Sequence, residues 1–516
     1  MVVIDALWYD RIGASGYSPA PGVFIDSLFE KSVLATNFYA SGCPTQFVFP
    51  SIFTSTLPLD NCGYGAGIRD RGKSFVEILK NAGYATAGFV TAGWCSRLYG
   101  YDRGFDTYHE FFDFSLFVRI LRDYQIGFYA DLVLQEKMAR TGFFEKIGPV
   151  LEAAFPALAR FCLDKLKETV RGGVLVSPTI HSWDFKNVID LVKSEQMKFS
   201  QSPETYMENL IPAWKTHPLF GTMADAPDGP LSSSGAYVIE QVKRWLENPR
   251  SAPFFVWAHL MDVHESRYST FDFVQSTENL KQESDCVAEM NARIDQKGDA
   301  YRSNKKHDCA LAYTDEQVKR LHAFLAEKGL LKDTIFVLTS DHGSRTAGFP
   351  RPDFKDISAF YDQLYHVPFA IIHESFQPSR LDQLCSSMDL APTILDMAGL
   401  PAPEEYRGAP VYSPKTHLRN HLIMEHVGRG PCDMEIKPIN ICVRTRQEKG
   451  VFISAPGLFE KSTVLSEAYD LVSDRYEQKN LADAGSQEPR FERLQEIATG
   501  RLSEIRTSVQ KTSPGL

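Results

Sequence analysis

The sequence contains 516 residues, of which 43% are hydrophobic, so the chain can form one large domain with additions or roughly two to three smaller domains. Lys and Arg number 55 against 65 Asp and Glu, which gives a net charge of −10. Because the sequence has no long block of like charge, this composition argues against a nucleic-acid groove and against a polybasic membrane patch.

The nine cysteines are spread from Cys43 to Cys442 without paired spacing. An odd number with this distribution is typical of reduced thiols and indicates a reducing compartment. The first residues show neither a basic region nor an apolar signal region, and no window approaches about 18 apolar residues without a charge. We therefore expect a cytoplasmic protein without a transmembrane segment, although its true start could lie upstream of Met1.

Residues 1–4 predict a buried strand that ends at Asp5, which places a carboxylate where open α/β sheets bind ligands. The alternative is that Asp5 only caps a turn. Residues 41–55 are typical of a turn that leads into a buried helix, with Thr45 at the junction. Thr45 is then either a helix cap or a nucleophile, and as a nucleophile it would need a metal or a base to ionise it.

The next elements establish a β-α-β alternation. Ser74 and Glu77 form a predicted capping box at the start of a helix over residues 74–83, and residues 84–90 predict the following strand. From 111 to 221, long helical periodicities and many aromatic residues replace this pattern. We predict a helical insertion or lid there, with its aromatic residues in a core.

Strand patterns resume at residues 253–259, which lead into Asp262 and His264. Two histidines and an aspartate at the end of a strand mark a candidate site. We assign His259 to the core and His264 to the site. A helix is predicted over residues 314–329, with Thr314 and Gln317 as its capping box.

The apolar residues 335–339 predict a strand buried on both faces, which runs into Asp341, His342 and Gly343. Taken alone, Asp341 is better explained as the cap of the next turn. Residues 365–373 predict another strand with His366 at its start, and residues 389–399 predict a helix. After about residue 405, hairpin-like segments and a charged helix near 488–508 follow.

Several stretches, in order over nearly the whole chain, resemble the sulfatase branch of the alkaline phosphatase superfamily. They are the strand ending in Asp5, Thr45 with Thr54 nine residues later, residues 340–343, residues 387–399, and residues 469–471 with 480–482. The resemblance implies that Asp5, Thr45, Asp341 and His342 hold one divalent metal. Two carboxylates, an alkoxide and an imidazole suit Mn, Zn, Mg or Ca, and the metal would ionise the Thr45 hydroxyl.

The same resemblance and the predicted elements imply an α/β fold with a large, mostly parallel mixed sheet sandwiched by helices. A helical insertion and a small C-terminal α+β subdomain complete it. The predicted boundaries are 1–110 and 222–404 for the α/β domain, 111–221 for the insertion and 405–516 for the subdomain.

The departures from the sulfatase pattern point to a different substrate. Sulfatases carry a Cys, or sometimes a Ser, in a Cys-x-Pro-Ser-Arg motif that is oxidised to formylglycine, whereas this register puts Thr45 there and Phe49 at the Arg position. Cys43 is two residues out of register, Ala6 replaces the second N-terminal aspartate, and the Gly-Lys-Trp-His stretch is missing. An unmodified threonine is similar to the nucleophile of the phosphodiesterases and phospho-group transferases of the superfamily. We therefore expect a metal-dependent hydrolase, or transferase, of phosphate mono- or diesters.

Three further residues receive candidate roles. His264 is assigned to protonating the leaving group or binding a non-bridging oxygen, and Lys355, fourteen residues after Asp341, to stabilising charge in the transition state. A solvated loop lysine is the alternative for Lys355. His366 could do either job, or Asp262, His264 and His366 could form a second metal site.

Two rival functions stay open. One is a true sulfatase that hydrolyses sulfuric esters, and the other is a catalytically silent binding protein of the same fold. The complete set of Asp5, Thr45, Asp341 and His342 argues against the silent protein. The expected partner is a small-molecule or a glycan- or lipid-linked ester substrate, with no nucleic acid, and the sequence predicts no oligomeric state.

Overall fold

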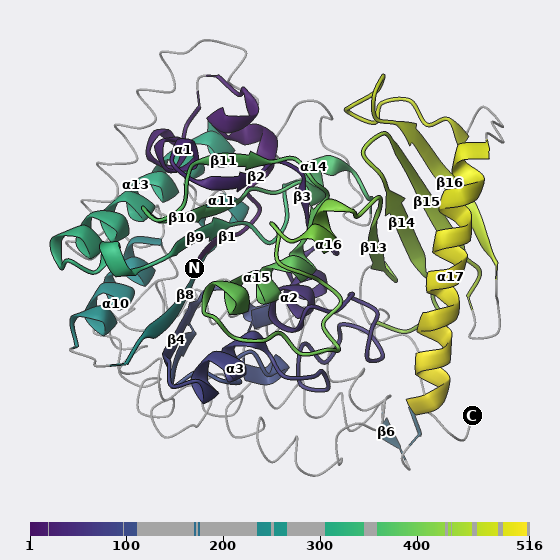
Figure 1. Ribbon diagram of the computed structural model, residues 1–516. Helices are drawn as coiled ribbons and strands as arrows, with labels where there is room; N and C mark the ends of the chain where they lie inside the picture. Colours follow the sequence, from purple (N-terminus) through teal and green to yellow (C-terminus); the bar gives the residue numbers. More distant parts are fainter. Residues whose placement is uncertain are drawn as a thin grey trace, which may run out of the picture. The chain divides into compact units, whose positions relative to one another are not determined.

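The computed structural model describes the chain in thirteen stretches, which leave out most of the predicted insertion (Figure 1). Both the insertion and Lys355 therefore fall largely or wholly outside the described residues. The described residues are 1–18, 20–95, 97–110, 170–171, 174–175, 235–248, 252–265, 305–344, 359–428, 432–434, 436–456, 462–482 and 489–512.

The central element is an eight-stranded mixed sheet whose order is β11-β2-β10-β9-β1-β8-β4-β5. Strand β1 (Val2–Ile4) lies in its middle and pairs in parallel with β8 (Phe254–Leu260) and β9 (Phe336–Thr339). The Val, Ile, Leu and Phe side chains of β1 and β9 are buried on both faces, as their apolar sequences predict. The outer strands are β2 (Val33–Ala35), β4 (Ala85–Val90), β5 (Thr107–Glu110), β10 (Phe369–Ile372) and β11 (Ser379–Leu381).

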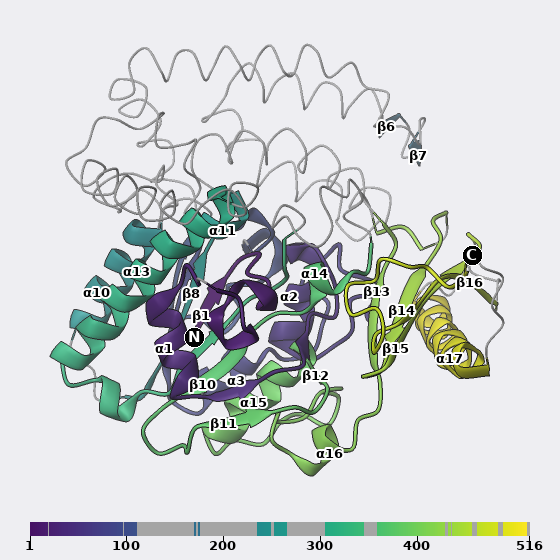
Figure 2. The same cartoon turned by 90° about the horizontal axis from the view of Figure 1, so that it is seen from above.

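Helices cover both faces of this sheet (Figures 1 and 2). One group packs together beside the sheet and consists of α1 (Val23–Glu30), α10 (Gly235–Glu247) and α13 (Lys305–Glu327). The other group lies across the sheet and consists of α2 (Thr45–Thr54), α3 (Phe75–Asn81) and α15 (Leu390–Met397). The predicted α/β architecture, with its sheet between two helical layers, is confirmed.

The starts of two helices can be compared with the capping boxes that the sequence predicts. The Ser74 side chain accepts from the backbone N–H of Glu77, and the Glu77 side chain accepts from the backbone N–H of Ser74, so the predicted capping box is present. The predicted box at Thr314 is wrong, because α13 already begins at Lys305. Thr314 instead donates its hydroxyl to the carbonyl of Ala310, 2.8 Å away, from within the helix.

The C-terminal part forms an antiparallel sheet of four strands with one long helix packed on it (Figure 1). Apolar side chains from the strands and the helix, among them Ile441, Phe452 and Leu502, share one buried cluster. These residues have the α+β character predicted for the C-terminal part, while the predicted boundary at residue 405 stays a prediction. Its elements are β13 (Leu422–His426), β14 (Asn440–Arg444), β15 (Glu448–Ser454), β16 (Thr463–Asp470) and α17 (Pro489–Thr512).

Two buried basic side chains of this small sheet reach α14 (Asp362–Tyr365). Arg444 on β14 donates to Asp362 Oδ2 at 2.8 Å, and Lys449 on β15 lies 3.2 Å from Asp362 Oδ1. Lys449 also pairs with the buried Glu477. The small sheet and the large sheet belong to one compact unit, made of Met1–Val90, Trp94–Thr107 and Ser234–Leu516.

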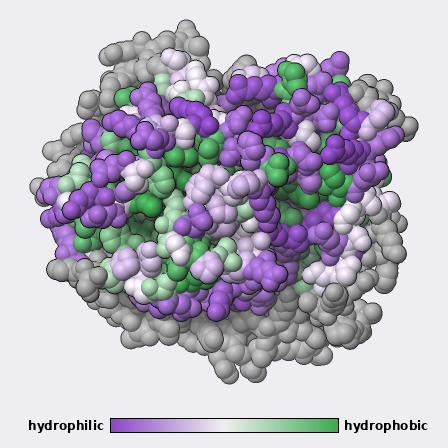
Figure 3. All heavy atoms as spheres, in the orientation of Figure 1, coloured by the Kyte–Doolittle hydropathy of each residue, from purple (hydrophilic) through white to green (hydrophobic). Residues whose placement is uncertain are grey.

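On the face shown in Figure 3 hydrophilic residues predominate, with apolar residues in patches between them, as is ordinary for a protein surface. Within the described part of the chain, no helix combines the length and the apolar character that a membrane crossing needs. The short elements are η1 (Tyr9–Arg11), η2 (Gly13–Ser15), β3 (Phe38–Tyr39), η3 (Gly93–Cys95), η4 (Arg97–Tyr99), β6 (Val170–Arg171), β7 (Val174–Leu175), α11 (Asp262–Glu265), η10 (Leu331–Asp333), β12 (Cys385–Ser386), η11 (Ser387–Asp389) and α16 (Pro414–His417).

Candidate active site

The candidate site lies at the carboxyl ends of the central strands. Asp5 follows β1, and Asp341 and His342 follow β9, so the parallel pairing of these strands brings the side chains to one edge of the sheet. The chain turns at Ala6, where φ is 63°, and the backbone N–H of Ala6 donates to Asp341 Oδ1 at 3.2 Å. This turn fixes the two carboxylates beside each other.

Thr45 reaches the same place from the first residue of α2. Its hydroxyl oxygen lies 3.2 Å from Asp5 Oδ2 and 3.1 Å from His342 Nε2. The position before the helix is Pro44, and no side chain caps this helix end. The alternative role of Thr45 as a helix cap is therefore wrong, and the hydroxyl faces the carboxylates instead.

His342 is oriented by its own backbone neighbourhood. Its Nδ1 lies 2.7 Å from the carbonyl of Gly343, so Nδ1 carries a proton, and Nε2 lies toward Asp5 and Asp341. Burial lowers the pKa of His342, but Asp341, a hydrogen bond with Cys43, and Asp5 together raise it well above its ordinary value. The buried carboxylates of Asp5 and Asp341 therefore stabilise a positive charge at this position.

Two observations show that a divalent cation fits this site. Asp5 Oδ1 and Asp341 Oδ2 are buried and accept no hydrogen bond among the described residues. Burial and the carboxylate of Asp341 raise the pKa of Asp5, against the opposing effect of the nearby histidines. A cation bound between two such carboxylates would remove this repulsion, and oxygen and imidazole donors suit the predicted Mn, Zn, Mg or Ca.

Two further histidines, His259 and His264, lie close to the residues that could hold the metal. Donor atoms of Asp5, His264 and His342 lie within 4.8 Å of one another, and so do those of Asp5, His259 and Asp341. His264 is exposed in the short α11, with its ring centroid 6.0 Å from that of His342. The structure therefore brings the predicted His264 to the edge of the site.

His259 was assigned to the core, and that assignment missed its contact with the site. The side chain is fully buried in β8, but its Nε2 lies 3.4 Å from Asp5 Oδ2. Burial lowers the pKa of His259, which favours the neutral imidazole that a metal requires. The register between β1 and β8, which pairs Val3 with His259, would have revealed this contact, but sequence alone does not give strand order.

The second metal site predicted from Asp262, His264 and His366 is not assembled. Asp262 Oδ1 accepts the backbone N–H of Gly235 at 3.0 Å, at the first turn of α10. His366 packs between the rings of Tyr9 and Tyr39, with centroid distances of 4.3 and 4.6 Å. Both side chains have structural partners, and neither belongs to a metal-capable group among the described residues. The same packing leaves the catalytic role predicted for His366 without support.

Known proteins resemble this chain over most of its length. The sulfatase family model matches residues 1–140 and 181–400. Arylsulfatase K of Bos taurus is 26% identical over 207 residues, which cover 35% of this chain and 37% of that protein. The chain thus spans about a third of the length of this curated relative.

Two solved structures share the fold. Phosphonate monoester hydrolase of Agrobacterium radiobacter has a TM-score of 0.54 at 15% identity and covers 98% of this chain and 95% of its own. A protein solved in complex with its substrate D-glucosamine-2-N,6-O-disulfate has a TM-score of 0.52 at 16% identity, with 100% and 98% covered. Because the family match extends over residues 1–140 and 181–400, which include Asp5, Thr45, Asp341 and His342, the chain belongs to the sulfatase family.

Proposed function

We propose that this protein is a metal-dependent hydrolase of sulfuric esters and that its substrate carries the sulfate on a carbohydrate. The observation that carries the proposal is the convergence of Asp5, Thr45 and His342 in a chain of the sulfatase family. The curated relative is named an arylsulfatase, and one structural neighbour was solved with a disulfated glucosamine. These relatives support sulfate over the phosphate ester that the sequence departures favoured.

Each residue of the candidate site has its own role in the proposed reaction. Asp5, Asp341, His342 and the Thr45 hydroxyl would hold a divalent cation, which would polarise the ester and lower the pKa of that hydroxyl. Thr45 Oγ1 releases its proton to solvent water and attacks the sulfur in line, and the bond between the sulfur and the alcohol oxygen breaks. His264, at the exposed edge, donates a proton to the departing alcohol. Water then attacks the sulfur of the Thr45 sulfate ester, which releases sulfate and regenerates the hydroxyl.

A second candidate is hydrolysis of phosphate mono- or diesters. One observation favours it: the hydroxyl in the site belongs to Thr45, and a threonine cannot be oxidised to formylglycine. One fold neighbour is named phosphonate monoester hydrolase, and its name supports this candidate. A silent binding protein is disfavoured, since both carboxylates, the hydroxyl and the imidazole are all present.

Turnover of matched aryl esters separates these candidates. We would measure kcat/KM of the full chain for para-nitrophenyl sulfate, para-nitrophenyl phosphate and bis-para-nitrophenyl phosphate, each with Mn, Zn, Mg or Ca. A clear preference for the sulfate supports the proposal, whereas a preference for either phosphate ester would replace it with the second candidate. The Thr45→Ala variant serves as the control, and equal rates for it and the native chain would exclude this site.

A further inference from the structure

Three buried serine hydroxyls lie behind the segment that delivers Thr45 to the candidate site, and the proposed reaction does not use them. They belong to Ser41, Ser51 and Ser387, each of which is at most 2% exposed. Ser41 precedes Thr45 by four residues, Ser51 follows it by six within α2, and Ser387 begins η11. Because a buried hydroxyl without a partner is costly, the hydrogen bonds of these serines constrain where the segment can lie.

The three hydroxyls form one hydrogen-bonded network, called the serine network below. The Ser41 hydroxyl donates to Ser51 Oγ at 2.5 Å. The hydroxyl oxygens of Ser41 and Ser387 lie 2.8 Å apart, and since the single proton of Ser41 is already used, Ser387 is the donor in this bond. The backbone N–H of Ser41 donates to Ser387 Oγ at 3.0 Å. Ser387 therefore binds Ser41 twice, and through Ser41 it is connected to Ser51 on α2.

Thr45 lies between two residues of the serine network, so the network holds the chain on both sides of it. The Thr45 hydroxyl oxygen lies 3.2 Å from Asp5 Oδ2 and 3.1 Å from His342 Nε2. Both distances are at the long end of the hydrogen-bond range, so a further shift of about 1 Å would break both contacts. The serine network therefore determines how close the Thr45 hydroxyl stays to the other groups of the site.

Ser387 is itself held by a buried carboxylate two residues later. Asp389 Oδ2 accepts the backbone N–H of Ser386 at 2.8 Å, and Asp389 Oδ1 accepts the backbone N–H of Ala409 at 2.9 Å. Arg419 donates to both carboxylate oxygens, with 2.7 Å to Oδ1. A bidentate pair of this kind fixes geometry as well as charge. The start of η11 is thus a firm anchor for the serine network.

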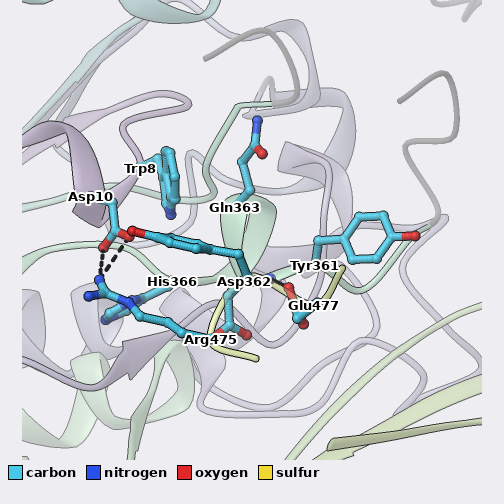
Figure 4. A pocket seen from close by; sticks show the side chains of 9 residues that line it. Trp8, Asp10, Tyr361, Asp362, Gln363, His366, Arg475 and Glu477 are labelled. Carbon is cyan, nitrogen blue, oxygen red and sulfur yellow. Dashed lines mark hydrogen bonds and ion pairs between the residues drawn. The ribbon is translucent and has the colours of Figure 1, made fainter. Parts of the chain in front are cut away.

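The imidazole side of the site is supported by different hydrogen bonds. The backbone N–H of Gly343 donates to the carbonyl of Leu364 on α14 at 2.7 Å, and the Gln363 side-chain amide donates to the carbonyl of Ser344 at 3.0 Å. Figure 4, a view of a small hollow lined in part by α14, shows Gln363 pointing away from Asp362. These bonds hold the segment after β9 and do not include the serine network. Loss of the network should therefore displace the hydroxyl relative to the imidazole.

We propose that Ser387 is a positioning residue, whose hydroxyl acts through the serine network to hold Thr45 against the carboxylate and the imidazole of the site. This role requires no contact of Ser387 with substrate or metal. It rests on the proposed function only in taking the Thr45 hydroxyl as a metal ligand and as the attacking group. It is the same for a sulfate and for a phosphate ester.

The chain offers a closely matched control for Ser387→Ala. Ser55, at the end of α2, is also fully buried and also joins α2 to η11. Its hydroxyl donates to the carbonyl of Met388 at 2.7 Å and accepts the backbone N–H of Gly408 at 2.9 Å. Ser387→Ala and Ser55→Ala each remove one donated and one accepted hydrogen bond, so they should lower the melting temperature to a similar extent. Only Ser387 is connected to both sides of Thr45.

Turnover gives the first readout. We expect Ser387→Ala to lower kcat for the fastest para-nitrophenyl ester by about 10- to 100-fold, the effect of a misplacement of about 1 Å, with KM changed by less than about twofold. Ser51→Ala, which breaks the serine network at its other end, is measured alongside, so that the test does not depend on the folding of one variant. Ser55→Ala should change kcat by less than about twofold. Equal losses of kcat in Ser387→Ala and Ser55→Ala, or no loss in the network variants, would overturn the proposal.

A double-mutant cycle on metal binding gives a readout that needs no reaction. Divalent metal is titrated calorimetrically into the metal-free native chain, Ser387→Ala, Thr45→Ala and the double variant. If Ser387 acts through the Thr45 hydroxyl, Ser387→Ala weakens metal binding by about tenfold in the native chain and by less than about twofold in the Thr45→Ala chain. Equal effects in both backgrounds would mean that Ser387 does not act through Thr45, and they would overturn the proposal.

The two readouts separate the positioning role from the proposed function. A chain that binds a divalent cation with the coupled pattern but cleaves no ester keeps the role of Ser387 and overturns the proposed function. A chain that cleaves para-nitrophenyl sulfate with the same kcat after Ser387→Ala keeps the function and overturns the positioning role. A native chain that neither binds a divalent cation nor cleaves an ester overturns both.

Discussion

The hydroxyl oxygen of Thr45 lies 3.1 Å from Nε2 of His342, although 297 positions of sequence separate the two residues. The contact joins the first turn of α2 to His342, which lies three residues after the end of β9. It places a hydroxyl group, a metal-capable imidazole and two carboxylates within one buried space. The predictions below follow from this contact and from the packing around it.

The Thr45 hydroxyl is expected to be the attacking group. Thr45→Ala should lower kcat by at least about 10³-fold, because no other part of the reaction replaces a missing nucleophile. Thr45→Ser keeps the hydroxyl and should retain most of this activity. Steady-state turnover of the best aryl ester measures both variants, with bound metal quantified in parallel. An alanine variant that turns over normally would show that another group attacks.

His259 is expected to support the metal through its contact with Asp5, 3.4 Å away. His259→Gln should weaken divalent metal binding by about 10- to 100-fold, the usual effect of losing a group that supports a ligand. Calorimetric titration of metal into the metal-free protein gives this affinity. His322→Gln is the control, since His322 lies on α13 and packs against Phe24 and Phe336. Equal metal affinities of the two variants would show that His259 is a core residue that does not support the metal.

The buried His366 should make the protein less stable in acid. Burial lowers its pKa to about 4, with Asp362 opposing and Arg444 and Arg475 reinforcing the shift. The unfolded chain takes up a proton near pH 6.5 and the folded chain does not, so stability is lost as the pH falls from about 6.5 to about 4. This loss amounts to at most about 3 kcal/mol.

His366→Phe keeps the aromatic stack and removes the titrating group. It should cost about 1 kcal/mol at neutral pH through the lost bond to Thr36, and it should flatten the acid dependence. Urea unfolding of both proteins between about pH 7 and about pH 4 measures the two slopes. Parallel slopes would mean that other groups cause the acid loss.

Lys449 should be required for stability. Its side chain is fully buried, donates to the carbonyl of Phe360 at 2.6 Å and pairs with Asp362 and Glu477. Lys449→Met leaves the buried Glu477 without a cation and should reduce the free energy of unfolding by about 3–5 kcal/mol. Urea unfolding at neutral pH gives this difference.

A surface pair provides the matched control for Lys449. Lys319 lies 3.2 Å from Glu316 on the exposed side of α13, and its side chain is 55% exposed. Lys319→Met should change the free energy of unfolding by less than about 1 kcal/mol, because solvent screens the pair. A comparable loss in both variants would argue against a special role of the buried lysine.

The central strands were predictable because each is a short apolar run with both faces buried. Residues 1–4 and 335–339 carried this signal, and so did the carboxylates that follow them. Thr45 was found through its spacing to Thr54, a one-dimensional feature of the chain. These predictions needed only local sequence or order along the chain.

The remaining site residues depended on tertiary pairing, which local sequence does not contain. His259 and His366 are both buried histidines beside strands, yet one contacts Asp5 and the other stacks between two tyrosines. Asp262 looked like a ligand by position, but it binds the start of α10. The start of α13 was misplaced because Thr314 bonds equally well as a cap or within a helix.

The ion pairs of Arg444 and Lys449 with Asp362 have a consequence for the folding of the protein during its synthesis. Asp362 begins the short helix that sets Gln363 against Ser344, two residues beyond His342. During synthesis, the ribosome completes the segment carrying His342 about a hundred residues before it reaches Lys449. The reactive edge of the sheet therefore acquires its final support only after β15 has emerged, so a nascent chain halted earlier should be catalytically idle despite containing every reacting residue.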